Sequence, residues 1–282
     1  MGNIAHAKFG SSRKTLRSEK LDTISVDKPW GVTELPQPFE AAEGRRIGEI
    51  WFRPPAHSSL LVKYIFTSER LSIQVHPDDD QARARGLASG KEECWYILGA
   101  KPGATLGIGT RERLGEMELA DAARSGAIED LMEWHPVTAG MFFHIPAGTV
   151  HAIGAGVSLV EIQQNADITY RLYDYGRPRE LHLADGAAVA VAEPMPDGLR
   201  QFVEPDASTR LLDSRHLGVA YLTAGDHSLL RDVPGGAMIV PLSGDVTLNG
   251  VSARAGECIW TEEPQALQTS PEARLLVGWD KG

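Results

Sequence analysis

Two short segments in which apolar and polar residues alternate constrain this fold more than any other part of the sequence. They are residues 71–76 and 91–98, and each has the pattern of a half-buried strand. Alternation places on one strand face Ser72, Gln74 and His76 in the first segment, and Lys91, Glu93 and Trp95 in the second. A strand has no structural use for a set of hydroxyl, amide, imidazole, ammonium and carboxylate groups facing one cavity. We therefore predict a metal site, completed by a ligand from elsewhere in the chain.

The missing ligand is expected from a later pair of apolar runs. Residues 146–148 (Pro-Ala-Gly) separate these runs and predict a tight hairpin, and His151 opens the return strand. With His76 and Glu93 it makes a set of two imidazoles and one carboxylate, with Gln74 as an optional fourth ligand. This set suits Zn²⁺ with one or two positions left for water or substrate. The same count of ligands also suits non-haem Fe(II).

Other charged residues lie in segments of the same kind. Lys63 interrupts the apolar run of residues 60–66, where an ammonium must reach a cavity, a counter-charge or solvent. Glu161 lies in a later predicted strand, and alternation after it groups Asp167 with Arg171. This last pair is either a surface ion pair worth under ~1 kcal/mol or part of the site.

Composition narrows the class of protein. The chain has 282 residues, with 29 Gly and 17 Pro that imply many turns between short strands. Its formal charge of -10 argues against a nucleic-acid binder, so cations for an anionic ligand must be gathered locally. We find no run near the ~20 apolar residues of a membrane span and no secretory signal, and expect a cytoplasmic protein. Cys94 and Cys258 fit a reducing compartment, with Cys94 expected as a packing thiol.

The order of the segments predicts three parts. We expect an N-terminal arm over residues 1–27, a metal-binding domain over 28–192 and a second β domain over 193–282. Apolar residues recur at helical spacing over residues 114–134 and predict two short helices inserted between strands of the metal-binding domain. Asn249-Gly250 predicts a hairpin in the second β domain.

A weak internal repeat supports two related β domains. Residues 139–146 parallel residues 255–262, since in each Ala-Gly leads into a strand and then a turn. No histidine follows the second copy where His151 follows the first. The second domain is therefore expected to lack a site.

Four blocks of sequence, in this order, resemble the short bacterial form of type I mannose-6-phosphate isomerase. They are residues 72–79, 91–98, 145–154 and 161–177. The resemblance implies a mainly β fold of two cupin-type jelly-roll barrels, with a short helical insertion in the first. It also implies one zinc ion per chain, although another divalent metal would fit. The implied activity is the interconversion of mannose 6-phosphate and fructose 6-phosphate through an enediol.

The resemblance also implies roles for single residues. The positions that match metal ligands are Gln74, His76, Glu93 and His151. The positions that match catalytic residues are Arg171, Glu161 and Asp167, and those that match substrate or phosphate contacts are Ser72, Lys63 and Lys91. The base stays open between Glu161, Asp167 and a metal-held hydroxide. One position departs from the pattern: Glu92 stands where these proteins usually have threonine.

Three other functions remain open at this point. The chain would bind a sugar phosphate without turnover if it were a sensor. The count of two histidines and one carboxylate, taken alone, also predicts an Fe(II) oxygenase. That class of enzyme has no need of Lys63, Lys91 and Arg171 around the metal. It would also be an isomerase if its substrate were another phosphorylated sugar. In each sugar-phosphate case the expected partner is a small molecule, with neither nucleic acid nor membrane.

Overall fold

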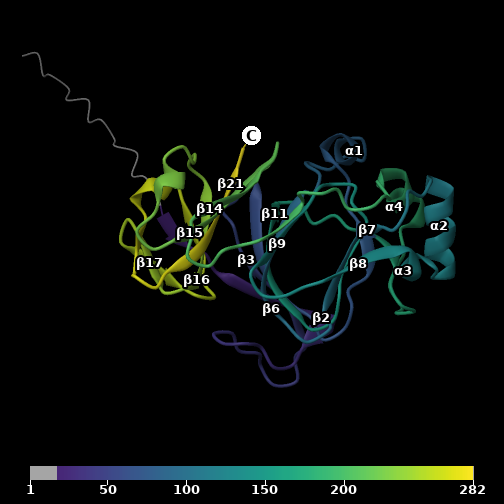
Figure 1. Ribbon diagram of the computed structural model, residues 1–282, viewed down its shortest axis with the longest axis horizontal. Helices are drawn as coiled ribbons and strands as arrows, with labels where there is room; N and C mark the ends of the chain where they lie inside the picture. Colours follow the sequence, from purple (N-terminus) through teal and green to yellow (C-terminus); the bar gives the residue numbers. More distant parts are fainter. Residues whose placement is uncertain (1–17, 282) are drawn as a thin grey trace, which may run out of the picture.

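The computed structural model describes residues 18–281, and most of its regular structure is β (Figure 1). Two antiparallel sheets form the part that contains the predicted site. The seven-stranded sheet has the order β13 (Arg200–Phe202), β9 (Met141–Ile145), β6 (Glu93–Ala100), β11 (Val157–Gln164), β4 (Leu60–Phe66), β3 (Ile47–Phe52) and β2 (Thr23–Val32). The five-stranded sheet has the order β12 (Tyr170–Tyr173), β5 (Ile73–Val75), β10 (His151–Ile153), β7 (Thr105–Thr110) and β8 (Met132–Pro136).

The inner faces of these two sheets pack on each other. Trp95 and Ile97 of the seven-stranded sheet and Ile108 and Ile153 of the five-stranded sheet are buried in one apolar cluster. Alternation along β6 turns Glu93 to the same side as Trp95 and Ile97. The polar site therefore shares the space between the sheets with an apolar core, which keeps bulk water away from it.

Helices cover the outer face of the five-stranded sheet (Figure 1). They are α2 (Glu116–Ser125), α3 (Ile128–Leu131) and α4 (Leu183–Val189), while the short α1 (Asp79–Arg83) follows β5. Leu119 and Ile128 pack against Ile73 and Val75, and Gly126 ends α2 in the left-handed conformation at φ 85°. The predicted helical insertion is confirmed. Within residues 18–281, no helix has the length and apolar character needed to cross a bilayer.

The remaining strands form a second pair of sheets. The six-stranded sheet has the order β1 (Ser18–Lys20), β19 (Ile259–Thr261), β16 (Ala237–Ser243), β21 (Arg274–Asp280), β15 (Leu217–Thr223) and β14 (Thr209–Asp213). The three-stranded sheet has the order β18 (Val251–Arg254), β17 (Asp245–Leu248) and β20 (Gln268–Thr269), and single 3₁₀ turns occur at η1 (Ser228–Leu230) and η2 (Pro264–Ala266). Asn249 and Gly250 have φ of 50° and 82°, as a type I′ turn requires, so the predicted hairpin is confirmed.

The six-stranded sheet packs on the outer face of the seven-stranded sheet. Val62 and Ile162 from the site-bearing sheet lie in one buried cluster with Val219 and Leu276. A fully buried side chain of this size contributes roughly 1.5–3 kcal/mol, so the contact stabilises both parts. Cys94 is free and buried in this cluster, which confirms its prediction as a packing thiol.

The structure corrects the predicted N-terminal arm for the residues that it describes. Residues 1–17 of that arm lie outside the described part. Ser18–Lys20 pairs with β19, and β2 begins at Thr23 and pairs with β3. The reason is that polar and apolar residues alternate from Thr23 to Val26, a strand pattern that the basic composition of the segment obscures.

The structure also corrects the hairpin predicted at residues 146–148. The strands on either side, β9 and β10, belong to different sheets, so this segment crosses between the sheets. A turn signal shows that the chain reverses but does not select the strand that the next segment pairs with. The amide of Gly148 donates to the carbonyl of His76 at 2.8 Å. The crossing thus brings His151 to the strand that carries His76.

Candidate metal centre and substrate pocket

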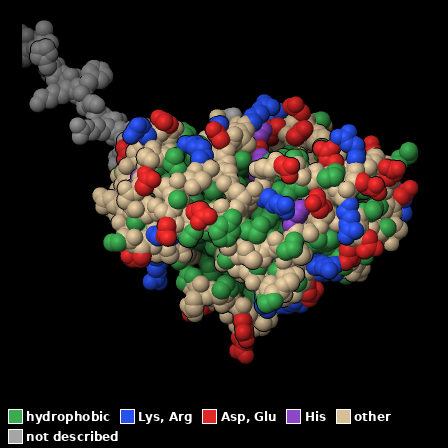
Figure 2. Space-filling model, viewed as in Figure 1, with side chains coloured by type: hydrophobic (Ala, Val, Ile, Leu, Met, Phe, Trp, Pro, Cys, Tyr) green, Lys and Arg blue, Asp and Glu red, His purple; other side chains and the backbone are tan. Residues whose placement is uncertain are grey.

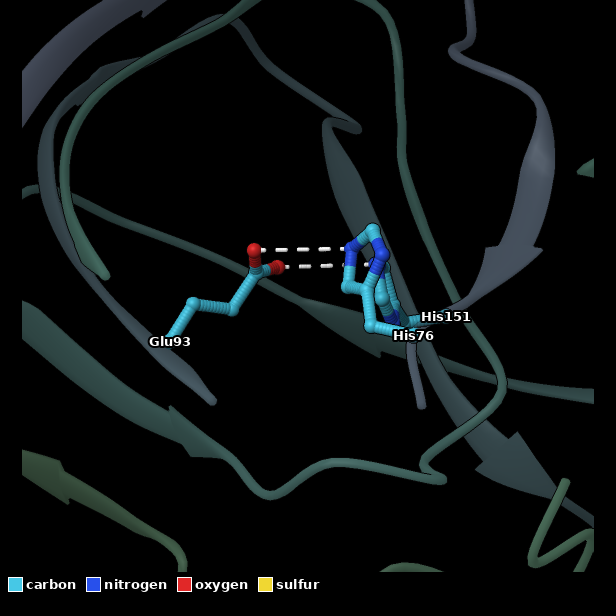
Figure 3. Close-up of side chains that lie close together, drawn as sticks. All are labelled: His76, Glu93 and His151. Atoms are coloured by element: carbon cyan, nitrogen blue, oxygen red, sulfur yellow. Dashed lines mark ion pairs between the residues drawn. The ribbon is translucent and has the colours of Figure 1, made fainter. Parts of the chain in front are cut away.

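The three predicted ligands His76, Glu93 and His151 meet between the two sheets. The Nε2 atoms of both histidines lie 3.5 Å from the Glu93 carboxylate, one at each oxygen. Each residue offers one potential ligand atom, and these three atoms lie within 4.8 Å of one another. All three residues are buried. Figure 3 shows the two imidazoles side by side, facing the carboxylate. His151 is the direct cross-strand partner of Gln74, which explains why ligands far apart in sequence meet here.

Backbone carbonyls orient both imidazoles. Nδ1 of His76 lies 2.7 Å from the carbonyl of Ile168, and Nδ1 of His151 lies 2.9 Å from that of Thr149. Each Nδ1 therefore carries the proton and each Nε2 presents its lone pair to the centre, as in histidine ligands oriented by a second partner.

Protonation of the three residues also fits a metal ion. Burial holds the pKa of His76 well below its ordinary value and lowers the pKa of His151 to about 4. Both rings are therefore neutral at pH 7. Among the described residues, neither Nε2 of His76 nor Oε1 of Glu93 has a hydrogen-bond partner, although both atoms are buried. A cation between them would satisfy both atoms.

Gln74 lies beside these ligands with its amide turned away from a ligating geometry. Its Nε2 is 3.2 Å from Nε2 of His151, and its Oε1 accepts a hydrogen bond from the Ser72 hydroxyl at 3.1 Å. Only Oε1 can ligate a metal, so ligation by Gln74 requires the amide to turn over. The hydroxyl of Ser72 can then accept from the amide nitrogen instead, since a hydroxyl both donates and accepts.

Two lysines and two carboxylates form a buried charge network next to the ligands. The ammonium of Lys91 lies 2.8 Å from Glu93 and 3.9 Å from Glu161, and that of Lys63 lies 3.2 Å from Glu161. Trp95 donates from its indole nitrogen to the other oxygen of Glu161 at 3.1 Å. Strand register explains this meeting, because Glu161 is the cross-strand neighbour of both Lys63 and Trp95.

The network separates the pKa values of its members. Burial, followed by Glu161, raises the pKa of Glu93. Burial also acts to raise the pKa of Glu161, but Lys91 and Lys63 together lower it. Burial acts to lower the pKa of Lys91, but Glu161 and Glu93 raise it above its ordinary value. Glu161 therefore stays ionised as the shared counter-charge of two ammonium groups.

Arg171 and Asp167 line the same pocket from the five-stranded sheet and the loop before it. Arg171 is the cross-strand partner of Gln74, and its Nη1 donates to the carbonyl of Glu180 at 2.8 Å. Its Nε is buried and has no hydrogen-bond partner among the described residues. Asp167 is exposed at the pocket wall. The structure thus gathers every residue predicted for the site into one region.

Five further charged or aromatic residues line the pocket and were missed in the sequence: Lys28, Trp30, Glu49, Trp51 and Arg179. Lys28 pairs with Glu49 at 3.0 Å, Trp51 donates to Glu49 at 2.6 Å, and the Lys63 ammonium lies 4.4 Å from the centre of a Trp51 ring. Glu49 and Trp51 alternate on one face of β3. That alternation was the available signal, although nothing in the sequence tied β3 to the site.

Arg179 is held at the pocket by a buried carboxylate. Its Nε and Nη2 donate to the two oxygens of Asp174 at 2.6 and 2.7 Å, a bidentate geometry that fixes the guanidinium. All residues that line this pocket fall between Lys28 and Arg179, and both β sheets of that part contribute. Figure 2 shows cationic and anionic side chains interspersed over the viewed face, so the cations of the pocket are a local gathering.

No protein-family model matches the chain. Over 177 residues the chain is 37% identical to the mannose-6-phosphate isomerase ManA of Bacillus subtilis. The matched region covers 60% of this chain and 55% of the relative. Over 205 residues it is 42% identical to the probable mannose-6-phosphate isomerase GmuF of the same bacterium, and this match covers 58% of this chain and 65% of the relative. Over these spans the chain is similar to mannose-6-phosphate isomerases. It spans about half the length of the curated relatives that it matches first.

Solved structures share the fold over nearly the whole chain. The mannose 6-phosphate isomerase from Bacillus subtilis matches with a TM-score of 0.73 at 24% identity, over 92% of this chain and 98% of that one. A zinc-bound mannose 6-phosphate isomerase matches with a TM-score of 0.69 at 15% identity, over 94% and 100%. The predicted fold class, mainly β and of the cupin type, is confirmed by this agreement.

Proposed function

We propose that the chain is a metal-dependent aldose–ketose isomerase that interconverts mannose 6-phosphate and fructose 6-phosphate. The strongest support is the direct contact between a metal-ligand set and buried cations in one pocket. Lys91 pairs with the candidate ligand Glu93, and Lys63 and Arg171 line the same pocket. A phosphorylated sugar needs such cations for its anionic end and a Lewis acid for its carbonyl end. The names of the homologous proteins point to the same activity.

We assign one zinc ion per chain to His76, Glu93 and His151, with Gln74 as a fourth ligand. When bound, the ion would act as a Lewis acid that polarises the two sugar oxygens at C1 and C2. A zinc-bound isomerase has the same fold, which supports this assignment. The donor set of two imidazoles and a carboxylate is one that zinc accepts, although other divalent metals accept it too.

The lysines gain a second role in this proposal. Because Glu93 would be engaged as a ligand, the ammonium of Lys91 becomes available to the substrate. Lys63 and Lys91 would then bind the substrate, including its phosphate, by charge-assisted hydrogen bonds, and Ser72 would bind a sugar hydroxyl. Arg171 would place a fixed positive charge next to the developing negative charge of the enediol.

The proton between C1 and C2 needs a base, and the two carboxylates predicted for that task, Glu161 and Asp167, differ in their surroundings. The oxygens of Glu161 already accept from Trp95 and pair with Lys63, and its lowered pKa makes it a weak acceptor of protons. Asp167 lines the pocket and is exposed. We therefore favour Asp167 as the base and Glu161 as the anchor of the lysines.

We propose that residues 28–192, extended by β13, which pairs with β9, carry the site, and that the rest of residues 193–282 forms a β domain whose task is structural. The pocket lining, which ends at Arg179, supports this division. The second domain would then act by covering the apolar outer face of the seven-stranded sheet.

The proposal is tested by incubating the purified chain with a panel of hexose and pentose phosphates and analysing the products. We expect conversion of mannose 6-phosphate to fructose 6-phosphate, and no conversion after metal removal. Preferred turnover of a different phosphate would replace the substrate. Tight binding without turnover of any member of the panel would contradict the enzyme and indicate a sugar-phosphate sensor. Oxygen uptake by iron-loaded protein would indicate an oxygenase.

A further inference from the structure

Glu92, the residue between Lys91 and the ligand Glu93, points away from the pocket. Alternation places it on the opposite side of the chain from its two neighbours, and it is nevertheless only 6% exposed. Its carboxylate lies 2.7 Å from Nε2 of His144 on the neighbouring strand β9. A buried carboxylate is costly unless it is paired, so this contact fixes the side chain.

The backbone around Glu92 is fixed by a second set of contacts. The side-chain oxygen of Gln164 accepts from the backbone amide of Glu92 at 2.8 Å, and the backbone amide of Gln164 donates to the carbonyl of Glu92 at 3.0 Å. The Nε2 of Gln164 also donates to Asp79 at 3.1 Å, and Asp79 accepts from the amide of Gly90 at 2.8 Å. One network therefore connects the segment after His76 with the segment that carries Glu93.

The C-terminal part of the chain reaches this network through the turn between β14 and β15. Nδ1 of His216 lies 3.9 Å from Oδ2 of Asp79. Ser214 shapes this turn, because its hydroxyl accepts from the backbone amides of His216 and Leu217 at 3.2 and 2.9 Å. The turn thus contacts the network at Asp79.

We propose that Glu92 is a positioning residue for the metal site and that it couples the turn of residues 214–216 to the ligands. The side chain of Glu92 is fixed to β9 by His144 and its backbone to β11 by Gln164, so the directions of Lys91 and Glu93 depend on these contacts. The proposal rests on the proposed function for the presence of a metal.

The test measures the zinc affinity of the full chain by competition with a chromophoric chelator. In Glu92→Ala we expect zinc affinity to fall about tenfold, the low end of the range for residues that orient ligands. Glu92→Gln should recover most of the loss, because it keeps the shape and one acceptor oxygen. His216→Ala should give a smaller loss, and combining it with Glu92→Ala should add less than the two single losses together.

Ser59→Ala is the matched control, since the Ser59 hydroxyl contacts Asp280 and so also joins the two parts of the chain, away from β6. Its zinc affinity should equal that of the wild type. If Glu92→Ala and His216→Ala lower the unfolding temperature but keep zinc affinity within twofold of the wild type, the network is merely structural and the proposal is wrong. If the wild type binds neither zinc nor another divalent metal, both this proposal and the proposed function fail.

Discussion

Replacing Glu161 by glutamine removes the shared counter-charge of two buried ammonium groups, and its cost can be derived from the distances. Glu161 lies 3.2 Å from the Lys63 ammonium and 3.9 Å from that of Lys91, and all three side chains are about 5–6% exposed. With an effective dielectric constant near 20, these distances correspond to about 5 and about 4 kcal/mol of attraction. The amide keeps the shape of the side chain and can still accept from Trp95.

Much of this attraction offsets the cost of burying the charges, so the expected loss is smaller than the sum. Removing one partner of a buried ion pair typically costs about 3–5 kcal/mol, because the other charge stays buried. We expect Glu161→Gln to lower the free energy of unfolding by this amount, a large part of the ~5–15 kcal/mol typical of a folded protein. Replacing Lys63 by methionine in the same variant should restore part of the loss, because it removes one unpaired charge.

The measurement is urea unfolding of metal-free protein at pH 8, followed by tryptophan fluorescence. Glu257→Gln is the matched control, since Glu257 pairs with Lys20 at 2.9 Å but both side chains are about one-third or more exposed. Such exposed pairs contribute under ~1 kcal/mol. A loss below 1 kcal/mol in Glu161→Gln would show that the buried charge network does not stabilise the fold as described.

Three further predictions concern catalysis, pH and the second domain. Arg171→Ala should lower kcat by about 10²–10³-fold with unchanged zinc content, and turnover within a few fold of the wild type would show that Arg171 is not catalytic. Burial lowers the pKa of His151 from 6.5 to about 4 in the folded chain. Between pH 4 and pH 6.5 the unfolded chain therefore binds up to one more proton at this residue than the folded chain. The metal-free chain therefore loses up to about 1.4 kcal/mol per pH unit from His151 as the pH falls through this window. In chemical unfolding, His151→Gln should show a correspondingly shallower slope, and equal slopes would contradict a neutral buried His151. A chain that ends at residue 203, after β13, should bind hydrophobic dyes and aggregate, because the outer face of the seven-stranded sheet loses its cover; a monomeric, dye-free truncation would show that this cover is dispensable.

Alternation was sufficient to predict which side chains face the site. Ser72, Gln74 and His76 lie on one side of β5 and its flanks, and Lys91 and Glu93 on one side of β6, because the period of a strand fixes the face of each residue. Cys94 illustrates the same rule in reverse, since it faces the second domain. These predictions are local and need no knowledge of which strands are neighbours.

The pairing of distant strands was not predictable from local pattern. His151 reached the site by crossing to the other sheet, although residues 146–148 had the pattern of a hairpin. Glu49 and Trp51 join the pocket only because β3 pairs with β4, where Trp51 is opposite Lys63. His151 was proposed as a ligand from its place after the turn at residues 146–148 and then from the resemblance to known isomerases, whereas Glu49 and Trp51 required the fold.

The central claim is that the ligand set at residues 76, 93 and 151 holds one metal ion on which turnover depends. It is tested most directly by removing all metal with a chelator, then titrating zinc into the protein while measuring bound zinc and the conversion of mannose 6-phosphate. We predict no activity in the metal-free protein and a linear recovery that is complete at one zinc per chain. Full activity in protein shown to contain no metal would contradict the claim.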